Sequence, residues 1–162
     1  YNWRMVVSGG YGLDGAIGQI TRNHNDLDLI LYGSQSRARA RELFHSACRS
    51  LLRVPELIFK EQEFYLECDV KSDVFVGNFY YVQTKNDPYR DLYSVIKNDG
   101  SIITNTPIDF PPPQKGSLND LTFEIQDQSA HQKDIMTKGG SNTERHTQDL
   151  ANLSILLTSP NI

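Results

Sequence analysis

A glycine pair and an aspartate pair, each beside an apolar run, constrain this chain more than any other feature. Gly9 and Gly10 follow the run Trp3–Val7, and Asp26 and Asp28 open a second apolar run. Valine, leucine and isoleucine are frequent in both runs, so each run is expected to form a short buried strand. The sequence therefore predicts a strand, a tight turn and a second strand within its first 35 residues.

The aspartate pair has the spacing of a metal site. Side chains two residues apart in a strand project from the same face, so Asp26 and Asp28 are expected to lie side by side. Two adjacent carboxylates repel each other unless a cation lies between them. Mg²⁺ is the fitting cation because it commonly takes one or two carboxylates together with substrate phosphates. A solvated strand end is the alternative for the pair alone.

The glycine pair precedes a segment with helical spacing of its apolar residues. Residues 13–20 carry this spacing, so Ser8, Gly9 and Gly10 are expected at a helix N-terminus. Backbone N–H groups there attract phosphate, and glycine permits close approach. Each feature alone also fits an ordinary turn, but the two together in one strand, turn, helix and strand favour a nucleotide site.

The string GGYGLDGAIGQITRNHNDLDL resembles the nucleotidyltransferase signature, GG(W/Y)xxD…R.H.D.D. It is most similar to the small adenylyltransferases that modify lincosamides and the 2″ position of aminoglycosides. The strings NDGSI and RHTQDLANL resemble the same enzymes further along the chain. The resemblance implies an α/β (α+β) nucleotidyltransferase fold, a mixed β-sheet with flanking helices, over residues 1–162 as a single domain. It also implies a start that is trimmed or unusually short, because relatives usually carry a helix before this point.

The resemblance further implies an activity and roles for individual residues. Asp26 and Asp28 would hold Mg²⁺, and a nucleoside monophosphate, AMP from ATP or from another nucleoside triphosphate, would pass to a hydroxyl of a small acceptor such as an aminoglycoside or a lincosamide. Arg22 would either neutralise phosphate charge or pair with Asp14. His24 would either steady the aspartates by hydrogen bonds or meet solvent.

The family's third acid comes from a later strand, and the chain offers several candidates. Strands are expected at residues 56–60, 64–70 and 74–83, with a turn at Lys71 and Ser72. Asp73 would begin the third of these strands, so it is favoured as general base and metal ligand, with Asp69 behind it. A looser fit places the third acid at Asn78, which cannot act as a base. Surface placement of the aspartates is the remaining alternative.

The other segments complete a helix-and-strand pattern. A helix capped by Ser36 is expected to reach about Leu52 with its arginines on a solvated face, and residues 84–100 to be irregular. Short strands are expected at residues 101–105 and 121–125, a surface loop at the three prolines 111–113, and helices at residues 129–138 and from about 143 to Leu157. His131 and His146 are expected on the surface or near substrate. Cys48 and Cys68 have no metal-like spacing and are expected to be buried thiols.

Composition narrows the classes of partner. The net charge of −4 opposes a nucleic-acid-coating role, and no apolar stretch approaches the roughly 18 residues of a membrane helix. No leader sequence precedes the first strand, so a cytoplasmic protein is expected; a homodimer stays open. Two other functions remain open at this stage: a toxin-like nucleotidyltransferase that modifies RNA, and a relative that binds nucleotide without catalysis.

Overall fold

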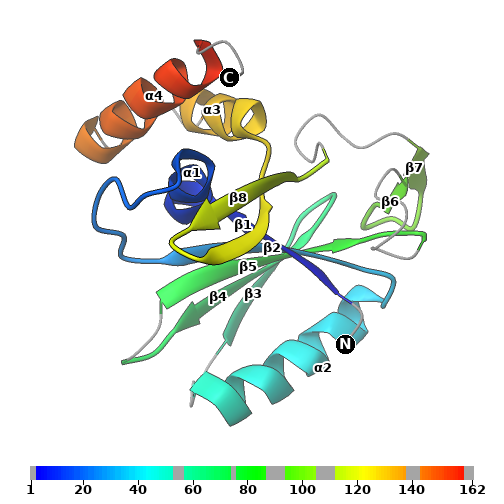
Figure 1. Ribbon diagram of the computed structural model, residues 1–162. Helices are drawn as coiled ribbons and strands as arrows, with labels where there is room; N and C mark the ends of the chain where they lie inside the picture. The colour runs from blue at the N-terminus through cyan, green and yellow to red at the C-terminus, as the bar shows by residue number, and fades with distance from the viewer. Residues whose placement is uncertain are drawn as a thin grey trace.

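The computed structural model describes residues 3–52, 57–73, 76–86, 94–104, 112–137 and 143–158. The elements in chain order are β1 (Arg4–Ser8), α1 (Gly9–Ile17), β2 (Leu27–Gly33), α2 (Arg37–Ala47), a π-helical turn (Cys48–Leu52), β3 (Leu57–Glu61), β4 (Leu66–Lys71), β5 (Val76–Gln83), β6 (Ser94–Ile96), β7 (Ile102–Thr104), β8 (Gln114–Leu118), β9 (Leu121–Ile125), α3 (Gln128–Thr137) and α4 (Thr143–Thr158). Within these residues, seven strands form one sheet in the order β3-β4-β5-β2-β1-β9-β8 (Figure 1). The short strands β6 and β7 pair separately.

The sheet is mixed, as the sequence predicts. β2 lies at its centre, antiparallel to β1 and parallel to β5, while β1 is also parallel to β9. The register places Ser8 opposite Asp28, Asp28 opposite Asn78, and Asn78 opposite Asp69. Residues that pair across neighbouring strands project from the same face. Four polar side chains therefore form one row across β1, β2, β5 and β4.

Helix α2 covers the opposite face of the sheet. It begins as predicted, because Ser36 caps it by accepting a hydrogen bond from the Arg39 backbone N–H at 3.2 Å. The buried cluster beneath it consists of Leu31, Ala40, Phe44, Cys48, Leu66, Cys68, Val70 and Tyr81. The prediction that the α2 arginines lie on a solvated face is wrong for Arg37. This side chain is buried and donates to the backbone carbonyls of Gln62 and Glu63 at 2.7 and 3.0 Å, which ties α2 to the β3–β4 turn.

The face that carries the polar row is apolar at its other end. A second buried cluster there consists of Val6, Ile30, Tyr32, Val82 and Val95, the last from β6. Along β2, every second residue projects from the same face, so Asp28 shares its face with Ile30 and Tyr32. The apolar cluster thus anchors the strands that hold the polar row.

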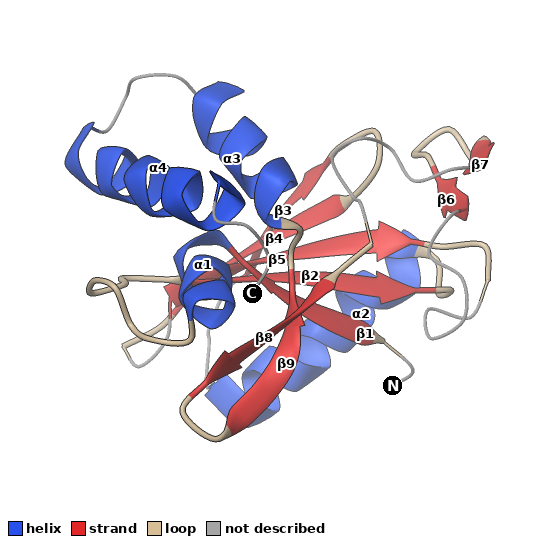
Figure 2. Cartoon of the chain, turned by 45° about the horizontal axis from the view of Figure 1, so that its top comes forward, coloured by secondary structure: helices blue, strands red, loops and turns tan. Residues whose placement is uncertain are grey.

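Helices α1, α3 and α4 group together at the β8–β9 end of the sheet (Figures 1 and 2). Leu13, Ile135 and Leu153 form the buried centre of this group, one from each helix. α1 packs closely on the β8–β9 hairpin because Gly15 and Gly116 carry no side chain. A Cβ on Gly116 would lie 2.9 Å from the Gly15 carbonyl oxygen. This close packing fixes α1, and with it the glycine turn.

Several boundaries differ from the sequence predictions. α1 begins at Gly9 and ends at Ile17, short of the expected Ile20, because Gly18 adopts the left-handed conformation with φ of 87°. β6 lies in a segment expected to be irregular, and β8 follows the prolines without having been predicted. Leu157 is exposed instead of lying in the core, and His131 is buried. Cys48 and Cys68 are buried free thiols, as predicted. The expectations for His146 and for Pro111 fall outside the described side chains, whereas Pro112 and Pro113 lie in a loop before β8.

None of the helices in the described segments is long and apolar enough to cross a membrane.

Candidate active site

Asp28 lies in the polar row between Ser8 on β1 and Asn78 on β5. The Asn78 amide Nδ2 donates a hydrogen bond to Asp28 Oδ1 at 3.1 Å. Asp26 precedes β2 by one residue and is exposed, whereas Asp28 is half-buried. The row thus presents one carboxylate supported by an amide, with a second carboxylate at the entrance of the same strand.

The glycine turn lies directly against Asp28. Gly9 has φ of 60°, a conformation that side chains other than glycine rarely adopt. A Cβ at this position would approach Asp28 Oδ2 to 2.4 Å, far inside contact distance. Gly9 is also the first residue of α1, and Ser8 precedes it as the N-cap without a side-chain capping bond. The positive end of the α1 dipole and the Asp28 carboxylate therefore meet at one glycine.

Gly10 is surrounded by the two basic residues of the motif. A Cβ on Gly10 would lie 2.3 Å from His24 Nδ1 and 2.8 Å from Arg22 Nη2. The ring of Tyr11, the next residue, lies 4.4 Å from the His24 ring, centroid to centroid. Gly10 is therefore required so that the loop before β2 can pack against the start of α1.

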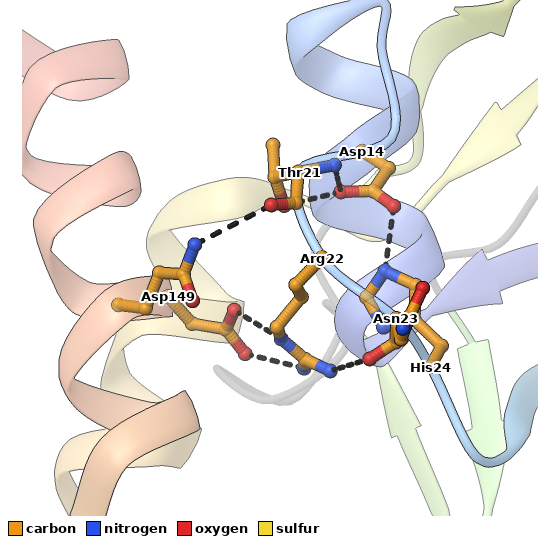
Figure 3. A network of polar contacts seen from close by, with 7 residues as sticks. Asp14, Thr21, Arg22, Asn23, His24 and Asp149 are labelled. Atoms are coloured by element: carbon orange, nitrogen blue, oxygen red, sulfur yellow. Dashed lines mark hydrogen bonds and ion pairs between the residues drawn. The ribbon is translucent and has the colours of Figure 1, made fainter.

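Asp14 holds that loop from inside α1 (Figure 3). It is fully buried and accepts hydrogen bonds from the Thr21 backbone N–H at 3.0 Å and the Thr21 hydroxyl at 2.6 Å. Its other oxygen lies 2.6 Å from His24 Nε2. His24 thus bonds to Asp14, the residue that also holds Thr21, and not to Asp26 or Asp28. Its side chain is only 3% exposed, so the alternative that His24 meets solvent is wrong.

Arg22 pairs with the last helix of the chain. Its Nε and Nη2 donate to the two carboxylate oxygens of Asp149 at 2.9 and 2.8 Å, as Figure 3 shows. The hydrogen-bonded Asp149 carboxylate raises the pKa of Arg22. Of the two roles left open for Arg22, the pairing with Asp14 is wrong: Asp14 is occupied by Thr21 and His24, and Asp149 is the partner.

The candidates for the third carboxylate lie in different places. Asp69 is in the polar row, opposite Asn78, and its Oδ2 lies 2.7 Å from Lys60 Nζ on β3. Asp73 is exposed in the loop after β4, and the described part of β5 begins at Val76. The expected strand start at residue 74 lies outside the described residues. Among the described residues, no three His, Cys, Asp or Glu side chains gather as a metal site would require. In the described structure the Asp26, Asp28 and Asp73 side chains are therefore not gathered into one cluster, and the role of Asp73 as a ligand stays a prediction.

The donor chemistry of the row nevertheless fits Mg²⁺. One or two carboxylates suffice for Mg²⁺ when substrate phosphates supply further oxygens. Gly9 leaves the space above Asp28 Oδ2 that any side chain would fill. Asp26 and Asp28 are the residues that would hold the ion, with phosphate on the α1 side.

A pocket of about 400 Å³ opens beside Asp26. It is lined by Val7, Tyr11, His24, Asn25, Asp26, Leu27, Val76, Leu118 and Phe123. Most of these side chains are apolar, and Asp26 is the single acidic one. The pocket can therefore hold an apolar or aromatic part of a ligand whose polar part reaches Asp26.

Comparison with known proteins agrees with this arrangement. Residues 1–112 match the family model described as aminoglycoside-2″-adenylyltransferase. This range is more than half of the chain and includes the glycine turn, Asp26, Asp28 and the polar row. The chain belongs to this adenylyltransferase family. No curated protein sequence matches the chain significantly.

Solved structures show the same nucleotidyltransferase fold. The antibiotic adenylyltransferase ANT(2″)-Ia in complex with adenylyl-2″-tobramycin has a TM-score of 0.62 at 16% identity, over 96% of this chain and 80% of that one. The lincosamide adenylyltransferase LnuA with bound lincomycin has a TM-score of 0.59 at 14% identity, over 95% and 87%. A nucleotidyltransferase-like protein from Paracoccidioides brasiliensis has a TM-score of 0.50 at 13% identity, over 99% and 71%. As a member of its family, the chain is a nucleotidyltransferase.

Sequence reasoning did not find the part played by Asp149. The string RHTQDLANL resembles the closing helix of the family, in which a basic and an acidic residue face the site, but nothing in the sequence pairs Asp149 with Arg22, which lies 127 residues earlier. The available signal was the acidic position within that string, and the structure shows Asp149 to be buried on α4.

Proposed function

We propose that this chain transfers AMP from ATP, with Mg²⁺ held by Asp26 and Asp28, to a hydroxyl of a small acceptor of the aminoglycoside or lincosamide kind. The observation that carries the proposal is the contact between Gly9 and Asp28 Oδ2, where a Cβ would leave only 2.4 Å. It brings a helix N-terminus, which favours phosphate, to the carboxylate that would hold the metal. Family membership supports nucleotidyl transfer as the reaction.

The residues of the turn would bind the triphosphate. Backbone N–H groups of Gly9 and Gly10 open α1 and would donate to phosphate oxygens. Mg²⁺, when bound by Asp26 and Asp28, would neutralise phosphate charge and polarise the phosphoryl group. Ser8 is buried at the N-cap and opposite Asp28, so its hydroxyl would support the same phosphate.

Arg22 and His24 would contribute by holding other parts of the site in place. Both bond to buried carboxylates, Asp149 and Asp14, so their contribution is to hold the loop that carries Asp26. Gly10 lies against both side chains, which places a guanidinium and an imidazole beside the start of α1. The Arg22 guanidinium would favour phosphate there.

Asp69 is the better candidate for the general base, in place of Asp73. It lies in the same row as Asp28, two strands away, whereas Asp73 is exposed beyond the end of β4. Strand spacing puts about 10 Å between the backbones of β2 and β4, enough for an acceptor hydroxyl to lie between the two carboxylates above Asn78. Asp69 would take the acceptor proton on its carboxylate.

A second function is favoured by one observation. Asn78 on β5, whose amide cannot act as a base, pairs with Asp28 and donates to its Oδ1. If Asp69 is too distant to act as base, the chain would bind nucleotide without transferring it.

Incubation with ATP labelled at the α-phosphate tests these alternatives. The reaction holds Mg²⁺ and, in separate tubes, an aminoglycoside, a lincosamide, tRNA or no acceptor. Label on an antibiotic supports the proposal. Label on tRNA supports the RNA-modifying alternative, and retention of ATP without transfer supports the non-catalytic one. The variant Asp28→Asn is the control, since it should lose transfer in every tube.

A further inference from the structure

Asn78 lies in the polar row between Asp28 and Asp69, at the position where the looser fit to the family places a third acid. It pairs with Asp28 on β2 and with Asp69 on β4, so its side chain lies between two acidic ones. Its amide donates to Asp28 Oδ1 at 3.1 Å. An aspartate at this position could not donate, and its charge would repel Asp28 unless a cation lay between them.

The remaining acidic groups do not replace that missing charge. Asp69 Oδ2 lies 2.7 Å from Lys60 Nζ, so this carboxylate is already paired with a cation. Lys60 also reaches Glu67 Oε1 at 3.3 Å. Within the described segments no three acidic, histidine or cysteine side chains converge on one point. Within the part of the chain that the structure describes, the carboxylates available to a cation at Asp28 are thus Asp28 itself and its neighbour Asp26.

We propose that Asn78 makes divalent-cation binding at this site depend on the nucleotide. With an amide at position 78, Asp26 and Asp28 hold the ion weakly by themselves, and the phosphates of the nucleotide supply the ligands that a third carboxylate would give. This inference rests on the proposed function, because it assumes that the row of Asp28 is where metal and phosphate meet. Asn78 is a positioning residue for Asp28 and sets the affinity of the site.

Titration with Mn²⁺, followed by its electron paramagnetic resonance signal, tests the proposal without any turnover. The wild-type chain should bind Mn²⁺ weakly alone and at least about tenfold more tightly with a non-hydrolysable ATP analogue, beyond what the analogue binds in free solution. Asn78→Asp should bind Mn²⁺ at least about tenfold more tightly than wild type without nucleotide, because the new carboxylate pairs with Asp28 in the row and adds a third negative charge to the site.

Asn119→Asp is the matched control. It adds the same charge at an exposed turn position between β8 and β9, so its Mn²⁺ affinity should equal that of wild type. If the crowding of three carboxylates unfolds Asn78→Asp, the double variant Asn78→Asp, Asp69→Asn keeps the wild-type net charge and should show the same gain.

The outcomes separate this proposal from the proposed function. Equal Mn²⁺ affinity of Asn78→Asp, its double variant and wild type overturns the role of Asn78 alone, provided that Asp28→Asn still abolishes nucleotide-dependent binding. Tight Mn²⁺ binding by wild type without nucleotide also overturns it. If neither wild type nor any variant binds Mn²⁺ with the analogue, the metal site of the proposed function fails as well.

Discussion

Arg22 and Asp149 form a two-bond ion pair between the loop that precedes β2 and the last helix. Nε and Nη2 of Arg22 donate to separate oxygens of Asp149 at 2.9 and 2.8 Å, and the Asp149 side chain is 4% exposed. Asp14 holds the same loop from the opposite side through Thr21 and His24. Two carboxylates from two helices thus fix the segment that ends in Asp26. α4 therefore helps to build the site although it carries no proposed ligand.

Removal of the Arg22–Asp149 ion pair should lower the free energy of unfolding more than removal of an ion pair on the surface. Asp149→Asn leaves the Arg22 guanidinium facing a neutral amide, so the free energy of unfolding should fall by about 2–4 kcal/mol, near the lower part of the range for buried pairs. Glu42→Gln breaks the Arg39–Glu42 pair, whose side chains are 58% and 66% exposed, and should cost less than about 0.5 kcal/mol. Urea unfolding of the two variants measures the difference. Equal losses would show that the Arg22–Asp149 pair does not hold the loop.

Alanine substitutions at Gly9 and Gly18 should distinguish the effect of backbone strain from the effect of a clash with Asp28. Gly9→Ala brings both backbone strain, since φ is 60°, and a clash with Asp28. Gly18→Ala brings strain alone, since φ is 87° and no atom beyond Gly18 and its two chain neighbours lies within 4 Å of the added Cβ. Both variants should lose about 1 kcal/mol of stability from strain, and Gly9→Ala more.

Calorimetric titration with Mg²⁺ and an ATP analogue completes this comparison. Gly9→Ala should lose at least about tenfold in affinity because its side chain displaces Asp28 and fills the space for phosphate, whereas Gly18→Ala should bind as wild type does. Equal affinity of the two folded variants would contradict the phosphate role of the turn.

Asp69 and Asp73 should differ in their effect on turnover. Asp69→Asn removes the carboxylate in the row of Asp28, so kcat with a reactive acceptor should fall about 10²- to 10⁴-fold while nucleotide affinity stays near that of wild type. Asp73→Asn changes an exposed loop residue and serves as the matched control, with kcat near that of wild type. A large loss in Asp73→Asn, with Asp69→Asn silent, would restore Asp73 as the base.

The sequence predicted the local parts of the site because they depend on residues near each other. Gly9 at the start of α1 and Asp28 on β2 follow from a turn between two apolar runs. The partner of Arg22 did not follow, since Asp14 and Asp149 carry the same charge and only the packing of α4 distinguishes them. The choice between Asp69 and Asp73 depended on where β4 ends, which residue alternation alone does not fix.

β8 shows a different limit of prediction. Its sequence, Gln114–Leu118, lacks the alternating apolar residues that mark a strand. It forms because it pairs with β9 and because Gly116 permits α1 to pack against it. Pairing with a neighbour and close packing are tertiary effects, so they override the weak local preference.

The thiol of Cys68 should make stability depend on pH in alkaline solution. Burial raises the pKa of this thiol from its usual 9.0 to about 12. The folded chain therefore holds the proton more tightly than the unfolded chain, so this contribution to stability is complete below about pH 9 and is lost as the pH rises toward 12. Urea unfolding between pH 8 and 11 should show a shallower decline for Cys68→Ala than for wild type. Parallel declines would exclude Cys68 as a source of the effect.

Binding of nucleotide to the end of the sheet at Asp28 is the central claim, and Mg²⁺-dependent calorimetry tests it most directly. Wild type and Asp28→Asn are each titrated with a non-hydrolysable ATP analogue, once with Mg²⁺ and once with a chelator at equal ionic strength. Wild type should bind with Mg²⁺ and lose at least about tenfold in affinity with the chelator, and Asp28→Asn should bind weakly in both conditions. The claim would be contradicted if wild type bound the analogue with the same affinity with Mg²⁺ and with the chelator. It would also be contradicted if a folded Asp28→Asn variant showed the same Mg²⁺-dependent affinity as wild type.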